Sequence, residues 1–258
     1  METTNTPFLS VIVPSYNEMK NLKRGVIEEM LEFLNKQKYS WEIILTDDGS
    51  TDGTIDVLKN IAKKNPNVNV LANVHAGKGP TVKAGMLSAT GKWRLFTDFD
   101  QSTPLEEVEK LLKFTETHKV IFGSREIAGA KRDKEPFYRH LMGRGFNLLV
   151  QILAVRGVKD TQCGFKLFSA ESTEKLFPAL YVYGGQQSRE DAFTGAFDVE
   201  LLFLARKFKV AHKEVPILWK HHNTDRVSPI KDSLRMLRDI IKIRIAYLMG
   251  KYRANHEN

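Results

Sequence analysis

Cysteine is almost absent from this sequence. Cys163 is the single cysteine among 258 residues. A disulfide within the chain is therefore impossible, and a zinc site built from cysteines is not expected. Such sparing use of cysteine is typical of proteins that work in a reducing compartment.

Long hydrophobic runs are missing as well. The sequence has no uninterrupted apolar stretch of about 18 residues, the length that a membrane-spanning helix needs. It also has no early apolar block with the flanks of a signal peptide. We therefore expect a protein that is soluble or peripheral on a membrane. Because 42% of the residues are hydrophobic, the chain can still bury a full core.

Most of the chain lacks an excess of charge of either sign. The net charge is +8, and residues 206–258 account for all of it, with 13 Lys and Arg against 5 Asp and Glu. A basic excess at one end indicates contact with an anionic surface, either a membrane or a nucleic acid. A nucleic-acid ligand would leave the acidic clusters of the chain without a use, so we expect no nucleic acid.

Short apolar runs alternate with segments of helical spacing in the first half of the chain. The runs at residues 8–13, 41–46, 68–72, 93–97 and 120–122 predict five strands. This alternation predicts a doubly wound α/β domain with a mostly parallel sheet. A polar cluster follows each of the first four runs. All four clusters are therefore expected at one edge of the sheet, where such sheets bind ligands.

Two carboxylates, Asp98 and Asp100, follow the fourth run. One residue separates them, which in a strand places both on the same side. Two hard oxygen ligands suit a divalent cation that shares its coordination with substrate phosphates, as Mg²⁺ commonly does. The alternative use of these acids is to cap the helix that follows. The spacing alone leaves both uses open.

The segment 230–252 predicts an amphipathic helix with a basic stripe. Its first apolar face consists of Ile230, Leu234, Leu237, Ile241, Ile245 and Leu248. The basic stripe beside that face consists of Lys231, Arg235, Arg238 and Lys242.

The remaining arc of this helix is also largely apolar, with Met236, Ile240, Ile243 and Tyr247. Two uses stay open: a helix that lies in a membrane interface, and a helix packed on its own domain with a solvated basic face. We divide the chain accordingly into a catalytic-type α/β domain at 1–227 and an amphipathic basic segment at 228–258, expected at a membrane interface.

Several motifs, taken in order, carry a resemblance to a known family. The first four are VPSYNE at 13–18, DDGSTDGT at 47–54, GKG at 77–79 and DFD at 98–100. Together they resemble inverting family 2 glycosyltransferases of the GT-A fold. Three later motifs narrow the resemblance to the dolichyl-phosphate β-glucosyltransferase branch, with dolichyl-phosphate mannose synthases as near relatives. They are DTQCGFKLF at 160–168, AFDVELL at 196–202 and RDIIKIR at 238–244.

The resemblance implies a nucleotide-sugar donor. It places Pro14, Tyr16 and Glu18, with Asp47 and Asp48, around the base and ribose. A carboxylate is a good acceptor for the imide N–H of uracil, although turn formation is an alternative use of the two aspartates.

The resemblance also implies a diphosphate and metal site. Lys78 lies between glycines that allow close backbone approach, so it is expected near phosphate, with a loop lysine as the alternative. Asp98 would meet ribose or metal, and Asp100 would hold Mg²⁺ or Mn²⁺ on the diphosphate. The metal would neutralise the leaving nucleoside diphosphate. Mannose synthases can add a Gln two positions later; Ser102 stands there, with Gln101 adjacent, which leaves a third protein ligand open.

The implied acceptor is a polyprenyl phosphate of the dolichyl type. Its oxygen is already anionic at neutral pH, so a strong general base is less necessary than for a sugar hydroxyl. Arg125, Lys166 and, less closely, Arg139 match the family's acceptor-phosphate positions, with surface ion pairs as the alternative. Asp198 would lie near the reacting centre or cap a helix. The candidate catalytic residues are thus Asp100, Arg125, Lys166 and Asp198.

These features predict inverting transfer of glucose from UDP-glucose to a polyprenyl phosphate. A GDP-mannose-dependent mannosyltransferase with the same acceptor and a soluble family 2 enzyme acting on a sugar hydroxyl stay open. A nucleotide-sugar-binding regulator without catalysis is disfavoured by the intact motif at 98–100.

Membrane contact also needs a source. Many relatives carry an N-terminal transmembrane anchor, and the first predicted strand begins about seven residues into this chain, so we expect no anchor. Contact with the cytoplasmic face of a membrane would then come from the C-terminal helix, from a helix predicted at 137–155, or from a separate membrane protein.

Overall fold

The computed structural model describes residues 6–133, 150, 154–185, 195–221 and 229–252. Seven strands form its central sheet: β1 (Leu9–Ser15), β2 (Trp41–Asp47), β3 (Val68–Ala72), β4 (Trp93–Thr97), β5 (Val120–Ser124), β7 (Phe165–Ser169) and β8 (His212–Pro216). A separate parallel ribbon pairs β6 (Lys131–Arg132) with β9 (Leu218–Trp219). The helix predicted at 137–155 lies almost entirely outside the described residues.

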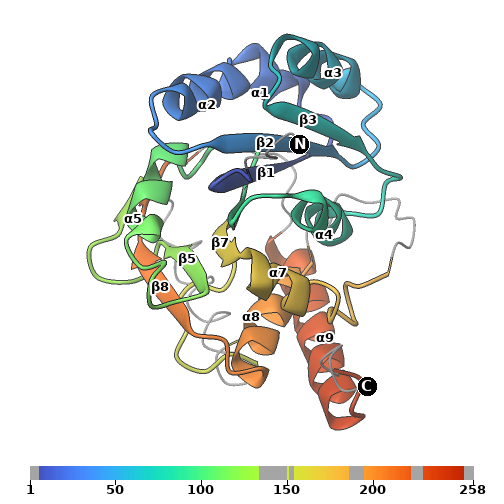
Figure 1. The fold of residues 1–258 in the computed structure, drawn as a ribbon. Helices are drawn as coiled ribbons and strands as arrows, with labels where there is room; N and C mark the ends of the chain where they lie inside the picture. Colours follow the sequence, from blue (N-terminus) through green and yellow to red (C-terminus); the bar gives the residue numbers. More distant parts are fainter. Residues whose placement is uncertain (1–5, 134–149, 151–153, 186–194, 222–228, 253–258) are drawn as a thin grey trace, which may run out of the picture.

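The strand order in the sheet is β3-β2-β1-β4-β7-β5-β8 (Figure 1). All neighbouring pairs are parallel except those made by β7, which is antiparallel to both β4 and β5. The predicted α/β architecture with a mostly parallel sheet is therefore confirmed. The sequence does not predict β7, which lies between β4 and β5. It places Lys166 beside Phe96 of β4 and Phe122 of β5, one residue in from the carboxyl end of β4.

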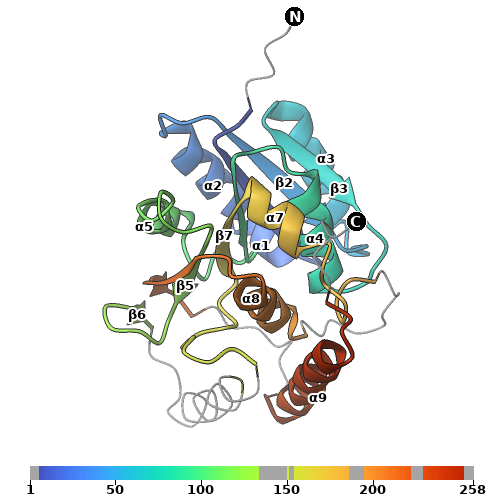
Figure 2. The same cartoon turned by 60° about the horizontal axis from the view of Figure 1, so that its bottom comes forward.

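Helices cover both faces of the sheet (Figures 1 and 2). One face packs against α2 (Val26–Asn35), α3 (Thr54–Lys64) and α5 (Val108–Leu112), with α1 (Met19–Lys23) and the 3-10 turn η1 (Leu105–Glu107) beside them. The other face packs against α4 (Lys78–Ser88), α7 (Ala170–Leu176) and α8 (Phe197–Lys207), with α9 (Pro229–Leu248) packed beside α8. Along β1, Val11 and Val13 enter one core and Ile12 the other, as the strand period requires.

The predicted C-terminal helix is present as α9, which packs beside α8. It buries Ile240, Ile243 and Ala246 in the core that it shares with α8. Within the described ranges, no helix has both the length and the apolar character needed to cross a bilayer. The boundary at residue 228 stays a prediction.

Candidate active site

The four polar clusters predicted at the sheet edge lie side by side. Each follows a strand, in the order β1, β2, β3 and β4, and each contacts another cluster. The contacts are Asn17 N to Ser50 Oγ (2.9 Å), Glu18 N to Thr54 Oγ1 (2.8 Å), His75 Nδ1 to Asp48 Oδ2 (2.8 Å), and an ion pair of Lys78 with Asp98. The edge is thus one continuous polar surface.

Asp48 is buried and shapes the loop before α4. Its carboxylate accepts hydrogen bonds from the backbone N–H groups of Ala76 (2.9 Å) and Gly77 (3.0 Å) and from the hydroxyl of Thr81 (2.8 Å). These bonds fix the backbone at the point where the loop enters α4, so Asp48 acts on the position of Lys78.

Asp47 is also buried and organises its own turn. Its carboxylate accepts hydrogen bonds from Ser15 Oγ (3.0 Å), Ser50 N (2.8 Å) and Ser50 Oγ (2.6 Å). Asp47 therefore has the turn-forming contacts considered as the alternative use, whereas the contacts of Asp48 lie in the loop before α4 and in α4 itself. Their role in binding the nucleoside stays a prediction.

Tyr16 stacks on His75, with ring centroids 4.2 Å apart and ring planes at 7°. The histidine follows β3 and is held by Asp48, so this aromatic pair lies among the predicted nucleoside-binding residues. Glu18 is buried and accepts a hydrogen bond from Asn21 Nδ2 (2.5 Å). Sequence reasoning did not single out His75, although its place in the third polar cluster was a usable signal.

Asp98 and Asp100 lie beyond the end of β4, in the turn that follows Thr97. The prediction that strand alternation places them on the same side is therefore wrong, because the strand ends before the pair. Asp98 accepts from the Lys78 ammonium, and Asp100 Oδ1 accepts from Ser102 N at 2.9 Å. A Cβ added at Gly164 would overlap the Asp98 carboxylate, so this turn packs against the residues before β7.

The donor atoms at this turn suit a hard divalent cation. Asp98 and Asp100 offer carboxylate oxygens, the preferred ligands of Mg²⁺ and Mn²⁺. Among the described residues, no three His, Cys, Asp or Glu side chains form a group that could hold a metal by themselves. The two residues therefore fit an ion that takes its other ligands from a diphosphate and water. Ser102 donates its backbone N–H to Asp100, and a third protein ligand stays an open part of the prediction.

Lys166 is the most deeply buried cation of the predicted set. Its side chain is fully buried, and Nζ lies 2.5 Å from Asp198 Oδ1 and donates to the carbonyl of Cys163. Asp198 lies in the first turn of α8 and is buried as well, which raises its pKa above the ordinary value although Lys166 opposes that shift. Asp198 thus forms a buried ion pair.

Lys78 begins α4 and pairs with Asp98. Burial alone would lower the pKa of the Lys78 ammonium, but the negative charges of Asp98 and Asp198 outweigh it and hold that pKa above its ordinary value. The pairs Lys78–Asp98 and Lys166–Asp198 are therefore electrostatic neighbours, with charges of alternating sign.

Arg125 follows β5 and makes a bidentate ion pair with Asp160. Its Nε and Nη2 atoms lie 2.7 and 2.8 Å from the two carboxylate oxygens, and its backbone N–H donates to Oδ2 at 2.9 Å. Burial would raise the pKa of Asp160, but the guanidinium charge and these hydrogen bonds hold it below the ordinary value. Sequence reasoning missed Asp160, although it opens the motif at 160–168.

We predict that Asp160→Asn destabilises the protein by about 2 kcal/mol at pH 7, because it removes a charged partner from buried hydrogen bonds. Since the folded-state pKa of Asp160 is depressed, its contribution is present above the unfolded-state pKa and is lost as pH falls through the folded-state value. Urea unfolding of the variant and the wild type at pH 7 and near pH 3 measures the destabilisation and its decrease in acid. A difference between variant and wild type that fails to shrink in acid would contradict the assignment.

The predicted acceptor cations that the structure describes are already paired with carboxylates. Arg125 and Lys166 each hold a carboxylate, and Arg139 lies outside the described residues. An entering phosphate would therefore share these cations with Asp160 and Asp198.

Comparison with known proteins identifies the family of this chain. Residues 10–177 match the family described as Glycosyl transferase family 2. A dolichyl-phosphate beta-glucosyltransferase from Dictyostelium discoideum is 36% identical over 94% of this chain and 76% of its own length.

Solved structures share the fold. Mannosyl-3-phosphoglycerate synthase from Rubrobacter xylanophilus has a TM-score of 0.62 and 15% identity over 98% of this chain and 77% of that chain. The mannosyltransferase PcManGT from Pyrobaculum calidifontis, solved with GDP-Man and Mn²⁺, has a TM-score of 0.50 and 17% identity over 96% and 74% of the two chains.

Proposed function

Because this chain belongs to glycosyl transferase family 2, we propose that it transfers glucose from UDP-glucose to a dolichyl-type polyprenyl phosphate with inversion. One observation in the structure carries the proposal. The carboxylates of the turn after β4 lie next to β7, the neighbouring strand, which carries Lys166, and Asp198 at the start of α8 forms a buried ion pair with that lysine. The names of the curated relatives supply the donor sugar and the acceptor class.

The donor would lie along the loops after β1, β2 and β3. Tyr16 with Pro14, Glu18, Asp47 and Asp48 would bind the nucleoside, and Lys78 would lie beside the diphosphate. Asp98 and Asp100 would hold Mg²⁺ or Mn²⁺, which when bound neutralises charge on the leaving nucleoside diphosphate. The residues of the chain itself then fix the donor in one orientation.

The acceptor phosphate would approach Arg125 and Lys166, with Arg139 as a further candidate. Its anionic oxygen attacks the anomeric carbon, a new C–O bond forms, and the bond to the diphosphate breaks with its electron pair on the departing oxygen. Attack opposite to the leaving group inverts the anomeric carbon. Asp198 positions the Lys166 ammonium, and the positive charge of that ammonium is shared between Asp198 and the incoming phosphate.

The Lys166–Asp198 contact also bears on the alternatives. A family 2 enzyme that acts on a sugar hydroxyl needs a carboxylate base near the anomeric carbon. Asp198 is occupied by Lys166 at 2.5 Å, which favours an acceptor that is already anionic. The choice between UDP-glucose and GDP-mannose is decided by the nucleoside pocket and the sugar contacts.

A panel of radiolabelled nucleotide sugars tests the proposal. Each donor is incubated with the protein, polyprenyl phosphate and Mg²⁺ or Mn²⁺, and the lipid phase is extracted. We expect label in the lipid from UDP-glucose alone, and none without a divalent cation. Label from GDP-mannose would establish the rival donor, and label in a water-soluble glycoside would establish a sugar-hydroxyl acceptor.

The membrane contact is assigned to α9, which presents apolar side chains that its own domain does not cover. Their exposed fractions run from 41% to 78%, and the residues are Leu234, Ile241, Ile245, Tyr247 and Leu248. Beside them, Arg238, Lys242 and Arg244 are exposed. An apolar helix face flanked by cations suits an anionic membrane interface, and we place the protein peripherally on the cytoplasmic face.

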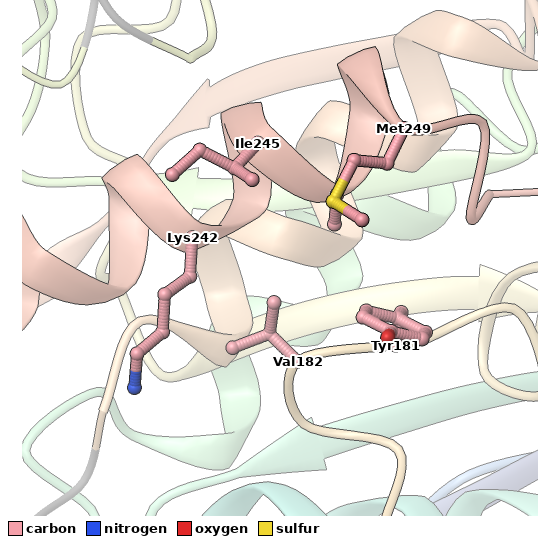
Figure 3. A pocket seen from close by; sticks show the side chains of 6 residues that line it. Tyr181, Val182, Lys242, Ile245 and Met249 are labelled. Atoms are coloured by element: carbon pink, nitrogen blue, oxygen red, sulfur yellow. The ribbon is translucent and has the colours of Figure 1, made fainter.

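A groove runs along this helix (Figure 3). Ile245 lines it from α9 and Met249 from the residue just after that helix, while Tyr181 and Val182 line it from the loop opposite, with Lys242 at one end. Apolar walls with one cation at the end match an acyl or isoprenoid chain beside an anionic headgroup. The groove therefore belongs to the proposed membrane contact.

Charge reversal on α9 tests this contact. We predict that changing the basic stripe to Glu lowers flotation with anionic liposomes at least about tenfold, since each basic residue near such a surface contributes about 1 kcal/mol. The four positions are Lys231, Arg235, Arg238 and Lys242. The matched control reverses four exposed lysines elsewhere, Lys23, Lys59, Lys63 and Lys92. Equal flotation of both variants would remove α9 as the contact.

A further inference from the structure

Tyr183 is a buried residue that the proposed reaction does not use. Its side chain lies between the starts of two site helices. A Cβ added at Gly79 of α4 would lie 3.4 Å from the Tyr183 ring, and one added at Gly195, just before α8, would overlap the ring. Gly195 also has a left-handed φ of 73°, which favours glycine. The ring therefore fills the space between the residues next to Lys78 and those next to Asp198.

The hydroxyl of Tyr183 joins α9 to α8. It donates a hydrogen bond to Asp239 Oδ2 on α9, and it accepts one from Ala196 N at 2.6 Å. Ala196 is the N-cap residue of α8 and stands two positions before Asp198. Asp239 is itself buried, so this oxygen connects two buried polar groups on different helices.

Glu200 fixes the backbone from which Tyr183 projects. Its side chain is fully buried on α8 and accepts hydrogen bonds from the N–H groups of Tyr181 (2.9 Å), Val182 (2.8 Å) and Tyr183 (3.0 Å). The loop is thus attached to α8 through Glu200 and to α9 through Asp239. Together, the contacts with Glu200 and Asp239 hold the Tyr183 hydroxyl at the start of α8.

We propose that Tyr183 is a positioning residue for the transfer reaction. Acting with Asp239, it fixes the first turn of α8, and through Asp198 it fixes the ammonium of Lys166 at the sheet edge. The C-terminal helix is then part of the geometry of the site as well as its contact with lipid. This inference rests on the proposed function, in which Lys166 meets the acceptor phosphate.

Tyr183→Phe keeps the ring and removes the hydroxyl. We expect kcat to fall about tenfold, since small displacements of a positioned group cost one to two orders of magnitude in rate. We expect the KM for UDP-glucose to stay within about twofold, because the predicted donor loops follow β1, β2 and β3. Asp239→Asn, which keeps the shape of the side chain, should also lower kcat. The fold decrease in kcat of the double variant should be smaller than the product of the two single decreases.

Tyr252→Phe is the matched control. Tyr252 donates to Glu200 Oε1 at 2.7 Å, so this variant also loses a buried tyrosine–carboxylate hydrogen bond on α8. Its kcat should stay within about twofold of wild type at a similar loss of thermal stability. Hydrogen–deuterium exchange should accelerate at residues 196–199 in Tyr183→Phe and not in Tyr252→Phe.

Lys166→Met, measured alongside, separates the two levels of the inference. Full activity of Lys166→Met would remove the proposed acceptor site itself. An inactive Lys166→Met together with a normal kcat in Tyr183→Phe would overturn only the role of Tyr183. Equal losses of kcat in Tyr183→Phe and Tyr252→Phe would also overturn it, because the loss would then follow from general destabilisation.

Discussion

Asp100→Ala is expected to abolish glucosyl transfer while leaving the fold intact. The loss should be about 10²–10³-fold or more, since charge stabilisation of the leaving group is the main demand of this transfer. The folding cost should be small, about 1 kcal/mol, because Asp100 is only partly buried and its side chain accepts from Ser102 N in its own turn. Labelled lipid formed from UDP-glucose and the thermal unfolding midpoint measure the two effects.

Asp56→Ala provides the control for this variant. Asp56 is exposed on α3, so its loss changes net charge equally without touching the sheet edge. Manganese affinity in the presence of UDP, followed by electron paramagnetic resonance, should fall in Asp100→Ala and not in Asp56→Ala. Near-normal turnover or unchanged manganese binding in Asp100→Ala would contradict the metal assignment.

The second large effect is expected from Lys166→Met. This variant leaves the Asp198 carboxylate buried without its partner, which costs about 3–5 kcal/mol of folding free energy. Transfer should also be lost, because this variant removes a cation that we propose meets the acceptor phosphate. Urea unfolding and the lipid-extraction assay, run below the unfolding midpoint, measure both losses.

The double variant Lys166→Met with Asp198→Asn separates stability from chemistry. Removing both charges should restore most of the folding free energy, since no unpaired buried charge remains. Transfer should stay at the level of the single variant. A double variant with wild-type turnover would show that the pair serves only the fold.

Arg94→Met is the matched control for a buried cation. Arg94 lies on β4 near its start, away from the turn at 98–100, and pairs with Glu174 at 3.2 Å. It should lower stability while the folded fraction keeps its turnover. If Arg94→Met lost as much turnover per folded molecule as Lys166→Met, the loss in Lys166→Met could not be attributed to the active site.

The sheet edge was predictable because its signals are local. Each of the first four strands is a short apolar run, and the polar residues that follow it are contiguous in the sequence. Parallel strands bring their carboxyl ends to the same edge, so the contact of Asp48 with His75 follows from the pairing of β2 with β3. The contact of Lys78 with Asp98 depends in addition on α4, because β2 and β1 separate β3 from β4 in the sheet.

The strand β7 was not predictable in the same way. Lys166 interrupts its apolar pattern, and the insertion of this strand between β4 and β5 depends on long-range pairing. The pairing of Lys166 with Asp198 likewise joins residues that are 32 positions apart. Sequence order alone assigns no partner to either side chain.

The contacts around Tyr183 were hidden for a related reason. Asp198 and Glu200 interrupt an otherwise apolar stretch of α8, all of it buried. Acidic residues in such a stretch signal a buried polar network, which is the clue that the sequence offered. Their partners, Lys166 from the sheet and the loop at 181–183, become visible only in the fold.

A crystal structure with UDP and Mn²⁺ tests the central claim most directly. Anomalous scattering should place the ion within about 2.0–2.3 Å of a carboxylate oxygen of Asp100, between that residue and the diphosphate, with Lys166 on the side where the acceptor would enter. An ion bound away from residues 98–100, or a diphosphate oriented so that the anomeric carbon would face away from Lys166 and Arg125, would contradict the account.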